Sequence, residues 1–330
     1  MFDNIDTIVK TKVIGIDVSV ETTEMAVVNL RGDILDKVGL ATTDYPELSG
    51  FVEALSENIV NLAEKNGGYE TVRSVGIGIP SGNYVTGSIE NAGNLPWKGI
   101  VPLAAMLRDR IGLAVALGND VHSCALGEYV YGSAHGMQNF GVVMANRAGL
   151  GSCFFINGQP HLGTCGSAGE LGHCCVKDGG RLCNCGRKGC LEAYMSVRGI
   201  RQTAVEVLEE SSEPSILRQA DKPTYEMICD ACKQDDALAL KTMYRTGKIF
   251  GKALANYATL LNPEAIVLTG PLTECIPWMK VSLKEAFDEY VFHNIRDKVK
   301  LVVSTIDNHE RGILGAAALA WSVKEYSLFK

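Results

Sequence analysis

The sequence predicts a mixed α/β protein with two lobes. Three observations support this expectation: the chain has 330 residues, hydrophobic residues make up 46% of it and can fill a large core, and strand and helix patterns alternate in two successive series. Each series opens with antiparallel strands and continues with strands that alternate with helices. This order is typical of a duplicated α/β architecture with a cleft between its lobes.

The first series is defined by apolar runs bounded by polar or turn residues. Short continuous runs predict strands, and apolar residues spaced three and four apart predict helices. Residues 31–33 form a turn after the second strand. The predicted elements are strands at 13–18 and 25–30, a helix at 48–63, a strand at 74–79, a helix at 101–110, a strand at 114–117 and a helix that starts after Asp120.

The second series contains longer helices and one segment without periodicity. Residues 163–190 are rich in glycine and cysteine and show neither helical nor strand spacing. The predicted elements are strands at 141–144 and 153–156, helices at 192–210, 223–233 and 236–261, strands at 265–269 and 301–304, and an alanine-rich helix at 311–324.

We expect a lobe boundary where the second series begins. Residues 1–120 form the expected N-terminal α/β lobe, and residues 121–310 form the C-terminal α/β lobe, which contains the cysteine-rich loop at 173–190. The terminal helix, within residues 311–330, is expected to pack back on the N-terminal lobe.

Charge and hydropathy exclude several classes of function. The net charge is −7 and no basic run occurs, whereas nucleic-acid binding needs clustered Lys and Arg. The start, MFDNIDTIVKTK, lacks the basic and apolar regions of a secretory signal, and no window reaches the roughly 18 apolar residues of a membrane helix. We therefore expect a cytoplasmic protein, whose eleven cysteines favour metal binding over disulfide bonds.

The strongest motif of the chain combines His173 with three closely spaced cysteines, Cys183, Cys185 and Cys190. Zinc favours four such imidazole and thiolate ligands in a closed tetrahedron when its role is structural. Glycines at 186 and 189 permit the tight turns that let the cysteines converge. Because the segment lacks apolar periodicity, metal binding would supply its folding free energy. The alternative is a loop of reduced thiols without a metal.

Six of the cysteines outside this motif are expected to be packing residues. Cys229 and Cys232 form a CxxC pair inside a helical pattern, which favours buried core thiols over metal ligands. The other members of this group are Cys124, Cys153, Cys165 and Cys275.

The cysteine motif belongs to a longer string. Residues 169–173 read GELGH and residues 183–194 read CNCGRKGCLEAY, and together they resemble the ROK family of bacterial sugar kinases and sugar-responsive repressors. Residues 76–99 resemble the sugar-binding segment of the family's glucokinases. Further similar segments are VIGID at 13–17, Asn119-Asp120, INGQ at 156–159 and GAAALAW at 315–321.

This resemblance implies an actin-like (ribonuclease H-like) sugar kinase fold of two lobes with an inserted zinc-binding loop. It also implies a structural Zn²⁺ on the four ligands above, a homodimer, and the use of ATP and Mg²⁺ where the chain is active. In the family pattern Asp120 is the general base for the sugar 6-hydroxyl, although Asp120 taken alone is a helix N-cap. The implied hexose ligands are Asn94, Asn119, Asp120, Glu170, His173 and Glu192.

These residue types suit a sugar. A hexose presents a ring of hydroxyls, which carboxylates and amides can satisfy as acceptors and donors. If one ring nitrogen of His173 binds the metal, the other is free for a sugar hydroxyl.

The nucleotide-binding elements depart from the family pattern. The first-strand Asp17 is followed after one residue by Ser19-Val20-Glu21 instead of Gly-Gly-Thr. Glu21 puts a charge where a triphosphate would lie, a repulsion on the order of 3 kcal/mol per charge at ~5 Å and an effective dielectric of ~20. The second phosphate turn reads Arg147-Ala148-Gly149, where Arg147 can pair with Glu21, and the adenosine-side turn reads Gly270-Pro271. The degenerate nucleotide set is Asp17, Ser19, Glu21, Arg147, Gly149 and Gly270.

Two functions remain open at this point. The first is an ATP-dependent hexose 6-phosphotransferase of the glucokinase type, weakened by the altered nucleotide turns. The second is a catalytically impaired, sugar-sensing regulatory protein of the same family. The family's repressors carry an N-terminal winged helix, for which the 12 residues before the first strand are too few, so direct DNA binding is not expected. A zinc hydrolase is disfavoured because four protein ligands close the zinc tetrahedron.

Overall fold

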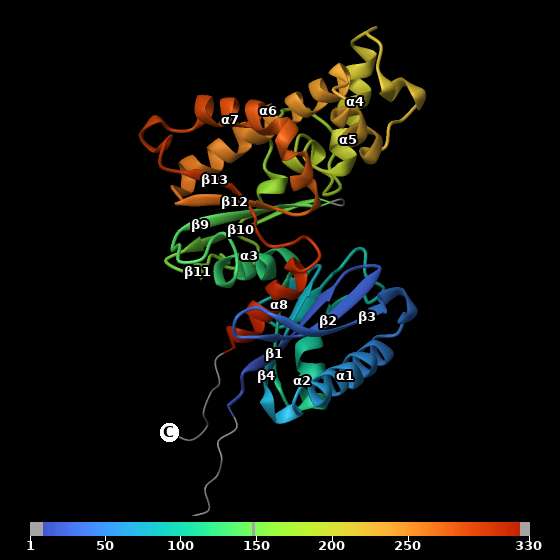
Figure 1. The fold of residues 1–330 in the computed structure, drawn as a ribbon, viewed down its shortest axis with the longest axis vertical. Coiled ribbons are helices and arrows are strands. Elements are labelled where there is room, and N and C mark those ends of the chain that lie inside the picture. The colour runs from blue at the N-terminus through green and yellow to red at the C-terminus, as the bar shows by residue number, and fades with distance from the viewer. Residues whose placement is uncertain (1–8, 147–148, 324–330) are drawn as a thin grey trace, which may run out of the picture. The chain divides into compact units, whose positions relative to one another are not determined.

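The chain is described by a computed structural model that covers residues 9–146 and 149–323. These residues form two compact units (Figure 1). Unit 1 comprises the described residues up to Gly136 together with those from Thr305 onwards, and unit 2 runs from Met137 to Ser304. The division after Gly136 differs from the expected boundary after residue 120, because helix α3 (Asp120–Val130) packs on the terminal helix α8 (Arg311–Trp321) within unit 1.

Unit 1 is built on a five-stranded sheet whose strands lie in the order β3-β2-β1-β4-β8. The first three strands pair antiparallel in chain order, and β4 runs parallel to both β1 and β8. The strands are β1 (Lys12–Val18), β2 (Thr22–Asn29), β3 (Ile34–Ala41), β4 (Val72–Ile79) and β8 (Ala114–Asn119).

Side chains alternate between the two faces of this sheet, as the pleat requires. Ile14 and Ile16 of β1 belong to a core shared with helices α1 (Leu48–Lys65) and α2 (Leu103–Ile111). Val13 belongs to a separate cluster that it forms with α8. The sheet therefore carries α1 and α2 on one face and α8 on the other, and Figure 1 shows α8 in red beside β1.

The alanine-rich helix α8 approaches the sheet closely because glycines face it. A Cβ on Gly15 would stand 2.6 Å from the carbonyl oxygen of Ile313, and one on Gly76 would stand 2.0 Å from that of Ala316. These distances leave no room for a side chain at either glycine. Small residues on both sides thus dock this helix, which ends at Trp321 before the expected end at 324, on the first strand of the chain.

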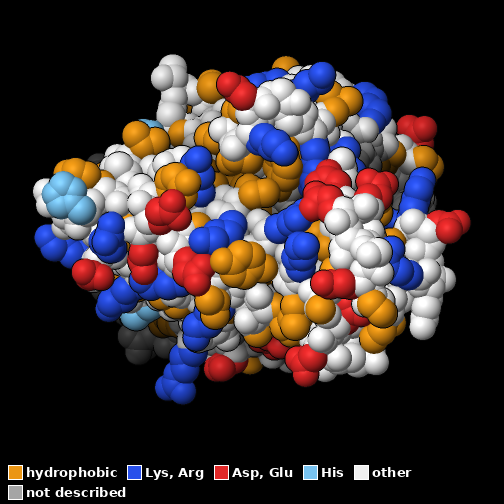
Figure 2. Space-filling view, turned by 90° about the horizontal axis from the view of Figure 1, so that it is seen from above, with side chains coloured by type: hydrophobic (Ala, Val, Ile, Leu, Met, Phe, Trp, Pro, Cys, Tyr) orange, Lys and Arg blue, Asp and Glu red, His pale blue; other side chains and the backbone are white. Residues whose placement is uncertain are grey.

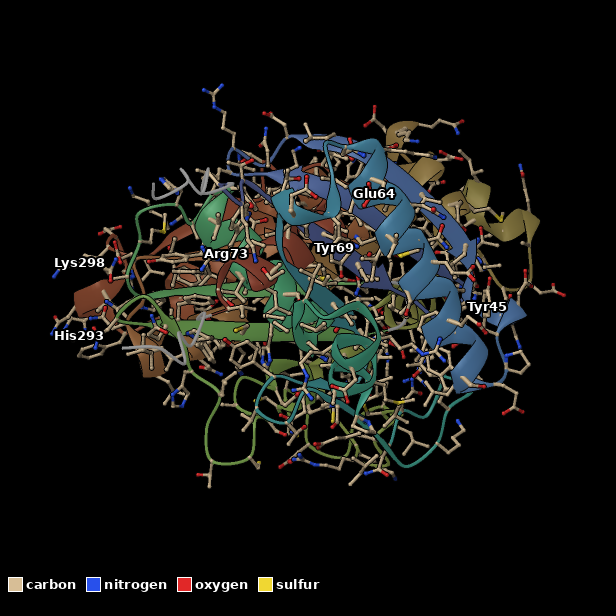
Figure 3. The ribbon with its side chains drawn as sticks, turned by 90° about the horizontal axis from the view of Figure 1, so that it is seen from below. Tyr45, Glu64, Tyr69, Arg73, His293 and Lys298 are labelled. Carbon is tan, nitrogen blue, oxygen red and sulfur yellow. The ribbon has the colours of Figure 1, made fainter. Side chains whose placement is uncertain are left out.

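A second sheet of unit 1 contains three short strands, β5 (Gly82–Asn83), β6 (Ser88–Glu90) and β7 (Ile100–Val101). Trp97 anchors the loop between β6 and β7. Its ring lies 4.3 Å from the ring of Phe51, and its Nε1 donates a hydrogen bond of 3.2 Å to the carbonyl oxygen of Tyr45. Figure 3 shows Tyr45 near the start of α1, so this loop is tied to the first helix of the unit.

Unit 2 contains a sheet with the strand order β11-β10-β9-β12-β13. Strands β9 and β10 form an antiparallel hairpin that β11 extends, and β12 runs parallel to both β9 and β13. This pattern of antiparallel strands followed by parallel ones repeats that of unit 1. The strands are β9 (Phe140–Ala145), β10 (Leu150–Ile156), β11 (Gln159–Pro160), β12 (Ala265–Thr269) and β13 (Lys300–Val303).

The core of unit 2 lies beneath its helices. The long helix α6 (Ala237–Leu261) packs against α7 (Ile276–Tyr290) and also contacts α4 (Val197–Glu209) and α5 (Tyr225–Lys233). No helix was expected from the sequence at the position of α7. Short 3₁₀ helices of the two units are η1 (Thr42–Asp44), η2 (Tyr69–Thr71), η3 (Leu171–His173), η4 (Leu191–Ala193), η5 (Ile216–Gln219), η6 (Pro271–Cys275) and η7 (His293–Ile295).

Two surface properties bear on the classes of function. Across the described residues, no helix combines the length and the apolar character that crossing a membrane requires. On the face that Figure 2 shows, Lys and Arg side chains lie among Asp and Glu side chains. That face therefore offers no continuous basic surface of the kind that nucleic acids bind.

Candidate functional site

Asp17 lies near the end of β1 and meets the start of α8. A Cβ added to Gly312, the second residue of α8, would stand 1.9 Å from Asp17 Oδ2, so the carboxylate rests against the helix backbone. Burial and the nearby Asp120 carboxylate raise the pKa of Asp17 to about 6, while Arg311 acts to lower it. A carboxylate held in this way gains from a bound cation.

Asp120 is the first residue of α3 and directly follows β8. Its Oδ1 accepts a hydrogen bond of 2.9 Å from the backbone N of Val121, and Asn119 Oδ1 accepts one of 2.8 Å from the same atom. The N-cap is therefore Asn119, and the local interpretation of Asp120 as the cap is wrong. Burial raises the pKa of Asp120, whereas the Val121 hydrogen bond and the Arg311 charge lower it.

Asp17 and Asp120 lie at the same edge of the unit 1 sheet. Strands β1 and β8 both run parallel to β4, which lies between them, so their carboxyl ends point the same way. Open α/β sheets bind ligands at this edge. Arg311 influences both carboxylates, and its Nη1 donates a hydrogen bond of 2.7 Å to Asn308 Oδ1. The two carboxylates can hold a divalent cation and one of them can accept a proton, while the guanidinium favours their ionised forms.

Asn94 lies in the loop between β6 and β7 with its side chain exposed. The ammonium group of Lys98 donates hydrogen bonds to the carbonyl oxygens of Ala92 at 3.3 Å, Gly93 at 3.2 Å and Leu95 at 2.8 Å. These bonds fix the backbone on both sides of Asn94. The amide of Asn94 is therefore held outside the core, where a ligand can reach it.

His173, Cys183, Cys185 and Cys190 come together in unit 2. Their ligand atoms all lie within 4.8 Å of one another. His173 Nδ1 is 3.7 Å from Cys183 Sγ, and Cys185 Sγ is 3.7 Å from Cys190 Sγ. A tetrahedron with metal–ligand bonds of about 2.3 Å has edges of about 3.8 Å. The donor set and its spacing therefore fit a zinc ion.

The backbone of the cysteine loop turns at two glycines. Gly186 has a φ of +83° and Gly189 a φ of +82°. A Cβ on Gly189 would stand 2.0 Å from the carbonyl oxygen of Lys177. The backbone N of Cys183 donates to the carbonyl oxygen of Arg187 at 2.8 Å, which closes the turn around Gly186. The expectation that both glycines shape this loop is confirmed.

Glu192 lies beside the cysteine cluster and is only 9% exposed. Its Oε1 accepts a hydrogen bond of 3.5 Å from Cys183 Sγ, and its Oε2 accepts one of 3.3 Å from the backbone N of Leu150. A Cβ on Gly149 would stand 2.4 Å from the same Oε2. Glu192 therefore links the cysteine loop to the β9–β10 hairpin, a contact that sequence reasoning did not identify.

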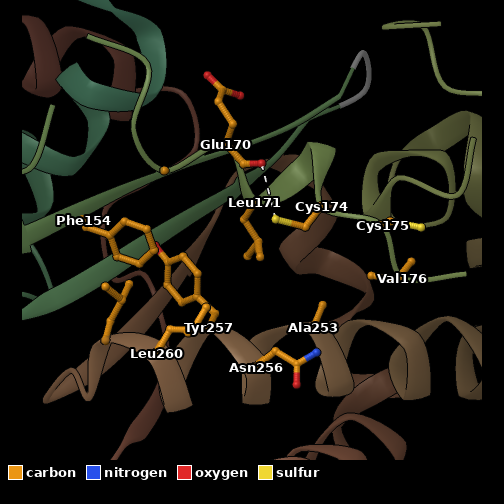
Figure 4. A pocket seen from close by; sticks show the side chains of 12 residues that line it. Phe154, Glu170, Leu171, Cys174, Cys175, Val176, Ala253, Asn256, Tyr257 and Leu260 are labelled. Carbon is orange, nitrogen blue, oxygen red and sulfur yellow. Dashed lines mark hydrogen bonds between the residues drawn. The ribbon is translucent and has the colours of Figure 1, made fainter. Parts of the chain in front are cut away.

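Glu170 and His173 lie at either end of η3. Because His173 directs Nδ1 toward Cys183, its Nε2 is the ring nitrogen left for another partner. Glu170 is exposed, and Figure 4 shows its carboxylate directed away from a cavity of about 270 Å³ that the stacked rings of Phe154 and Tyr257 help to line. That mostly apolar cavity does not suit a hexose, and the Glu170 carboxylate faces outward from it.

The turn between β1 and β2 closes on itself. The backbone N of Ser19 donates to the carbonyl oxygen of Thr22 at 2.8 Å, and the backbone N of Thr22 donates to Ser19 Oγ at 3.0 Å. Val20 and Glu21 are exposed, and neither has a positive φ. Two of the amides that a phosphate cradle would use are therefore already paired.

The other two nucleotide turns are described in part. Gly270 has a φ of +95°, and a Cβ there would stand 2.5 Å from the carbonyl oxygen of Ala145, so glycine is required. Pro271 is the first residue of η6, a position at which a missing N–H does not disturb the helix. Arg147 and Ala148 lie outside the described residues, as does the expected contact between Arg147 and Glu21.

Sequence reasoning missed two residues of the site. Arg311 is a basic residue in the first turn of α8, where the helix dipole disfavours positive charge, and this mismatch is a signal that could have identified it. Lys98 fixes the Asn94 loop through carbonyl oxygens, and a lysine that follows a tryptophan carries no signal for that role.

Comparisons with known proteins place this geometry in context. The model of the ROK family matches residues 13–323. The chain is 31% identical over 322 residues to a glucokinase of Halalkalibacterium halodurans, and the match covers 94% of both chains. It is 29% identical over 217 residues to the DNA-binding transcriptional dual regulator NagC of Escherichia coli K12, which covers 66% of this chain and 52% of NagC.

Solved structures show the same relationship. A ROK family glucokinase from Streptomyces griseus, in complex with glucose and AMPPNP, matches with a TM-score of 0.76 and 26% identity, over 94% of this chain and 100% of that chain. The fold and the site thus define an α/β protein with the actin-like fold of sugar kinases. The chain belongs to the ROK family, and the resemblance found in its motifs is confirmed.

Proposed function

We propose that this protein binds a hexose such as glucose and transfers the γ-phosphate of ATP to the sugar's 6-hydroxyl. The cluster of Asp17, Asp120 and Arg311 carries the proposal. Asp120 does not supply the cap of its own helix. Burial raises its pKa and so strengthens it as a proton acceptor, while the guanidinium of Arg311 favours its ionised form. A carboxylate in that state can take the proton of the 6-hydroxyl as its oxygen attacks the γ-phosphorus.

The residues proposed as hexose ligands have polar groups that are exposed or held ready for a partner. In unit 1, Asn119 Oδ1 is occupied by the Val121 amide, which leaves its Nδ2 as a donor, and Asn94 is exposed. In unit 2, Glu192 is held by Leu150 and Glu170 is exposed. The solved glucose complex of the Streptomyces griseus relative supports glucose as the ligand class. The proposed set is Asn94, Asn119, Asp120, Glu170, His173 and Glu192.

We assign the cluster of His173, Cys183, Cys185 and Cys190 to a structural zinc ion. A bound Zn²⁺ supplies a fixed tetrahedral anchor for a loop that has few apolar contacts of its own. His173 would hold the metal through Nδ1 and offer Nε2–H to a sugar hydroxyl. The same loop would then serve both stability and recognition.

The nucleotide side is weaker than the sugar side. Asp17 would hold Mg²⁺, which neutralises phosphate charge when it is bound. The internally bonded turn at residues 19–22 offers few free amides, and Glu21 adds a negative charge there. Pro271 contributes no N–H at the adenosine-side turn. We therefore propose slow phosphate transfer.

A second candidate function is sugar sensing without catalysis. The closed Ser19–Thr22 turn favours it, because a regulator needs the sugar site and the zinc loop but no phosphate cradle. Similarity to the regulator NagC supports the same candidate. In either case we propose a cytoplasmic homodimer that does not bind DNA directly, and eleven cysteines without a disulfide fit a reducing compartment.

Calorimetric titration with glucose tests the sugar site directly. Glu170→Ala should weaken binding by ~1–3 kcal/mol, or about 5- to 150-fold, because a hydrogen-bonding partner of a sugar hydroxyl is lost. The matched control is Glu64→Ala, which removes an exposed carboxylate from α1 and should leave the affinity unchanged. Equal affinities for wild type and Glu170→Ala would place hexose binding elsewhere.

A further inference from the structure

A cluster of two thiols and a phenol lies in unit 2 outside the candidate site. The Sγ of Cys229, on α5, is 3.5 Å from the Sγ of Cys275, the last residue of η6. The Cys275 thiol also hydrogen-bonds with the hydroxyl of Tyr225 at 2.6 Å. Cys275 and Tyr225 are buried, whereas Cys229 is half-exposed. One cysteine of the pair is therefore partly exposed and the other is buried.

This cluster does not have the composition of a metal site. Cys232 lies on the same helix as Cys229 and is buried, yet no ligand group of three or more forms here. Within the part of the chain that the structure describes, only the His173 set brings three or more His, Cys, Asp or Glu ligand atoms within 4.8 Å of one another. Two adjacent thiols without further ligands have the arrangement of a dithiol.

We propose that Cys229 and Cys275 form a reversible disulfide when the protein meets hydrogen peroxide. Cys229 sulfur attacks one peroxide oxygen and breaks the O–O bond, which yields a Cys229 sulfenic acid and one water. Cys275 sulfur then attacks the Cys229 sulfur, forms the S–S bond and releases the sulfenic oxygen as a second water. Two thiols lose two electrons and two protons, and one peroxide becomes two waters.

The surroundings suit this division of roles. The hydrogen bond with Cys275, together with Tyr225 and Lys233, lowers the pKa of Cys229 to about 7 against the opposing effects of burial and Glu274. Cys229 is then partly thiolate at neutral pH, which is the nucleophilic form. The same hydrogen bond and burial raise the pKa of Cys275, so it stays protonated until the second step.

The bond would tie α5 to the start of α7. The two sulfurs must approach from 3.5 Å to about 2.05 Å, a closure of about 1.5 Å that draws η6 toward α5. Cys275 ends the short helix that begins at Pro271, directly after Gly270. The proposed function assigns the Gly270-Pro271 turn to the adenosine of ATP. An effect of oxidation on nucleotide affinity therefore rests on that function, whereas formation of the disulfide does not.

Peptide mapping of the full-length, zinc-loaded protein tests the proposal. After treatment with hydrogen peroxide and alkylation of the remaining thiols, a non-reducing digest should contain a peptide joining Cys229 to Cys275 that dithiothreitol separates. Metal content measured at each time point shows whether this bond forms before the zinc ligands react. The proposal is overturned if peroxide oxidises other cysteines while Cys229 and Cys275 are both recovered alkylated, or if Cys229 pairs elsewhere.

Variants assign the two roles. Cys229→Ser should slow peroxide-dependent thiol loss at Cys275 at least tenfold, and Cys275→Ser should leave Cys229 as a sulfenic or sulfinic acid without the linked peptide. Cys232→Ser, a buried thiol of the same helix, is the matched control and should form the linked peptide at the wild-type rate. If a variant does not fold, the wild-type map alone decides. Affinity for an ATP analogue, measured with reduced and with oxidised protein, is a separate readout. If neither form binds the analogue, that result contradicts the proposed kinase but leaves the disulfide proposal untouched.

Discussion

The carboxylate of Asp17 and the α-carbon of Gly312 are in direct contact, so that a Cβ on Gly312 would stand 1.9 Å from Asp17 Oδ2. This contact joins the end of the first strand to the first turn of the last helix. It brings Arg311 to the two carboxylates of the candidate site. Arg311 of the last helix therefore acts to lower the pKa of two carboxylates that lie far earlier in the sequence, against the larger effect of their burial.

Gly312→Ala should destabilise unit 1. The added methyl group overlaps the Asp17 carboxylate, and overpacking of this kind costs about 1–3 kcal/mol. Urea unfolding should show a lower free energy of unfolding. Gly50→Ala is the control: its Cβ would meet only Tyr45, at 3.8 Å, and alanine in helix α1 should stabilise by about 0.5–1 kcal/mol. Equal changes in the free energy of unfolding for Gly312→Ala and Gly50→Ala would contradict the close contact between Asp17 and Gly312.

Asp17→Asn should raise stability at neutral pH in the absence of Mg²⁺ and nucleotide. Because the pKa of Asp17 is raised to about 6 from 3.8, the folded state binds the proton more tightly than the unfolded chain does. The stabilisation of the folded state that this tighter proton binding at Asp17 provides is fully present below pH 3.8. It falls as the pH rises toward 6 and is lost above pH 6. The variant should gain on the order of 3 kcal/mol at pH 8 and little at pH 4. Thermal unfolding of wild type and Asp17→Asn at pH 4 and at pH 8 measures this gain. The same stability difference between the two proteins at both pH values would contradict the prediction.

Cys185→Ser should remove the bound metal. One zinc per chain is expected in the wild type by elemental analysis, and loss of one thiolate opens the tetrahedron and lowers the free energy of unfolding. Cys165 is exposed, so the expectation that it is a packing residue is wrong, and Cys165→Ser should keep both metal and stability. A metal-free wild-type protein, or a Cys185→Ser variant with full metal content, would refute the assignment.

Restoring Gly-Gly-Thr at residues 19–21 should strengthen use of ATP. Ser19→Gly removes the hydroxyl that occupies the Thr22 amide, Val20→Gly restores backbone freedom, and Glu21→Thr removes a negative charge. The kcat/KM for ATP should rise at least tenfold in a coupled assay, with glucose affinity unchanged. Glu57→Thr on α1 serves as the charge control. No gain in the triple variant, with intact glucose binding, would favour the sensing function.

Much of the fold follows from local patterns. The apolar runs of β1 and the small residues of α8 predicted both elements, and GAAALAW indicates by its composition a helix that packs closely. Helix α7 was not predicted, although Leu283 and Phe287 are buried at helical spacing. The close spacing of the cysteines in the loop indicated that they converge, and the structure brings them together.

The candidate site was harder to predict where contacts join distant residues. The pairing of Glu192 with Leu150 depends on how the cysteine loop meets a hairpin 42 positions away in sequence. Arg311 acts on Asp120 only because α8 returns to the first sheet. The helix N-cap is Asn119, one residue before the expected Asp120. A single sequence does not define the residue at which a strand ends and the next helix begins to better than one or two positions.

Direct observation of hexose 6-phosphate by ³¹P NMR, with wild type and Asp120→Asn under saturating glucose, ATP and Mg²⁺, tests the central claim that Asp120 is the base of a slow sugar kinase. Asparagine keeps the size and much of the hydrogen bonding of the aspartate but cannot accept the proton. The account predicts wild-type turnover below the ~10 s⁻¹ typical of enzymes, and a further loss of at least about 100-fold in Asp120→Asn while glucose still binds. Equal turnover in the two proteins, or no turnover in the wild type, would contradict it.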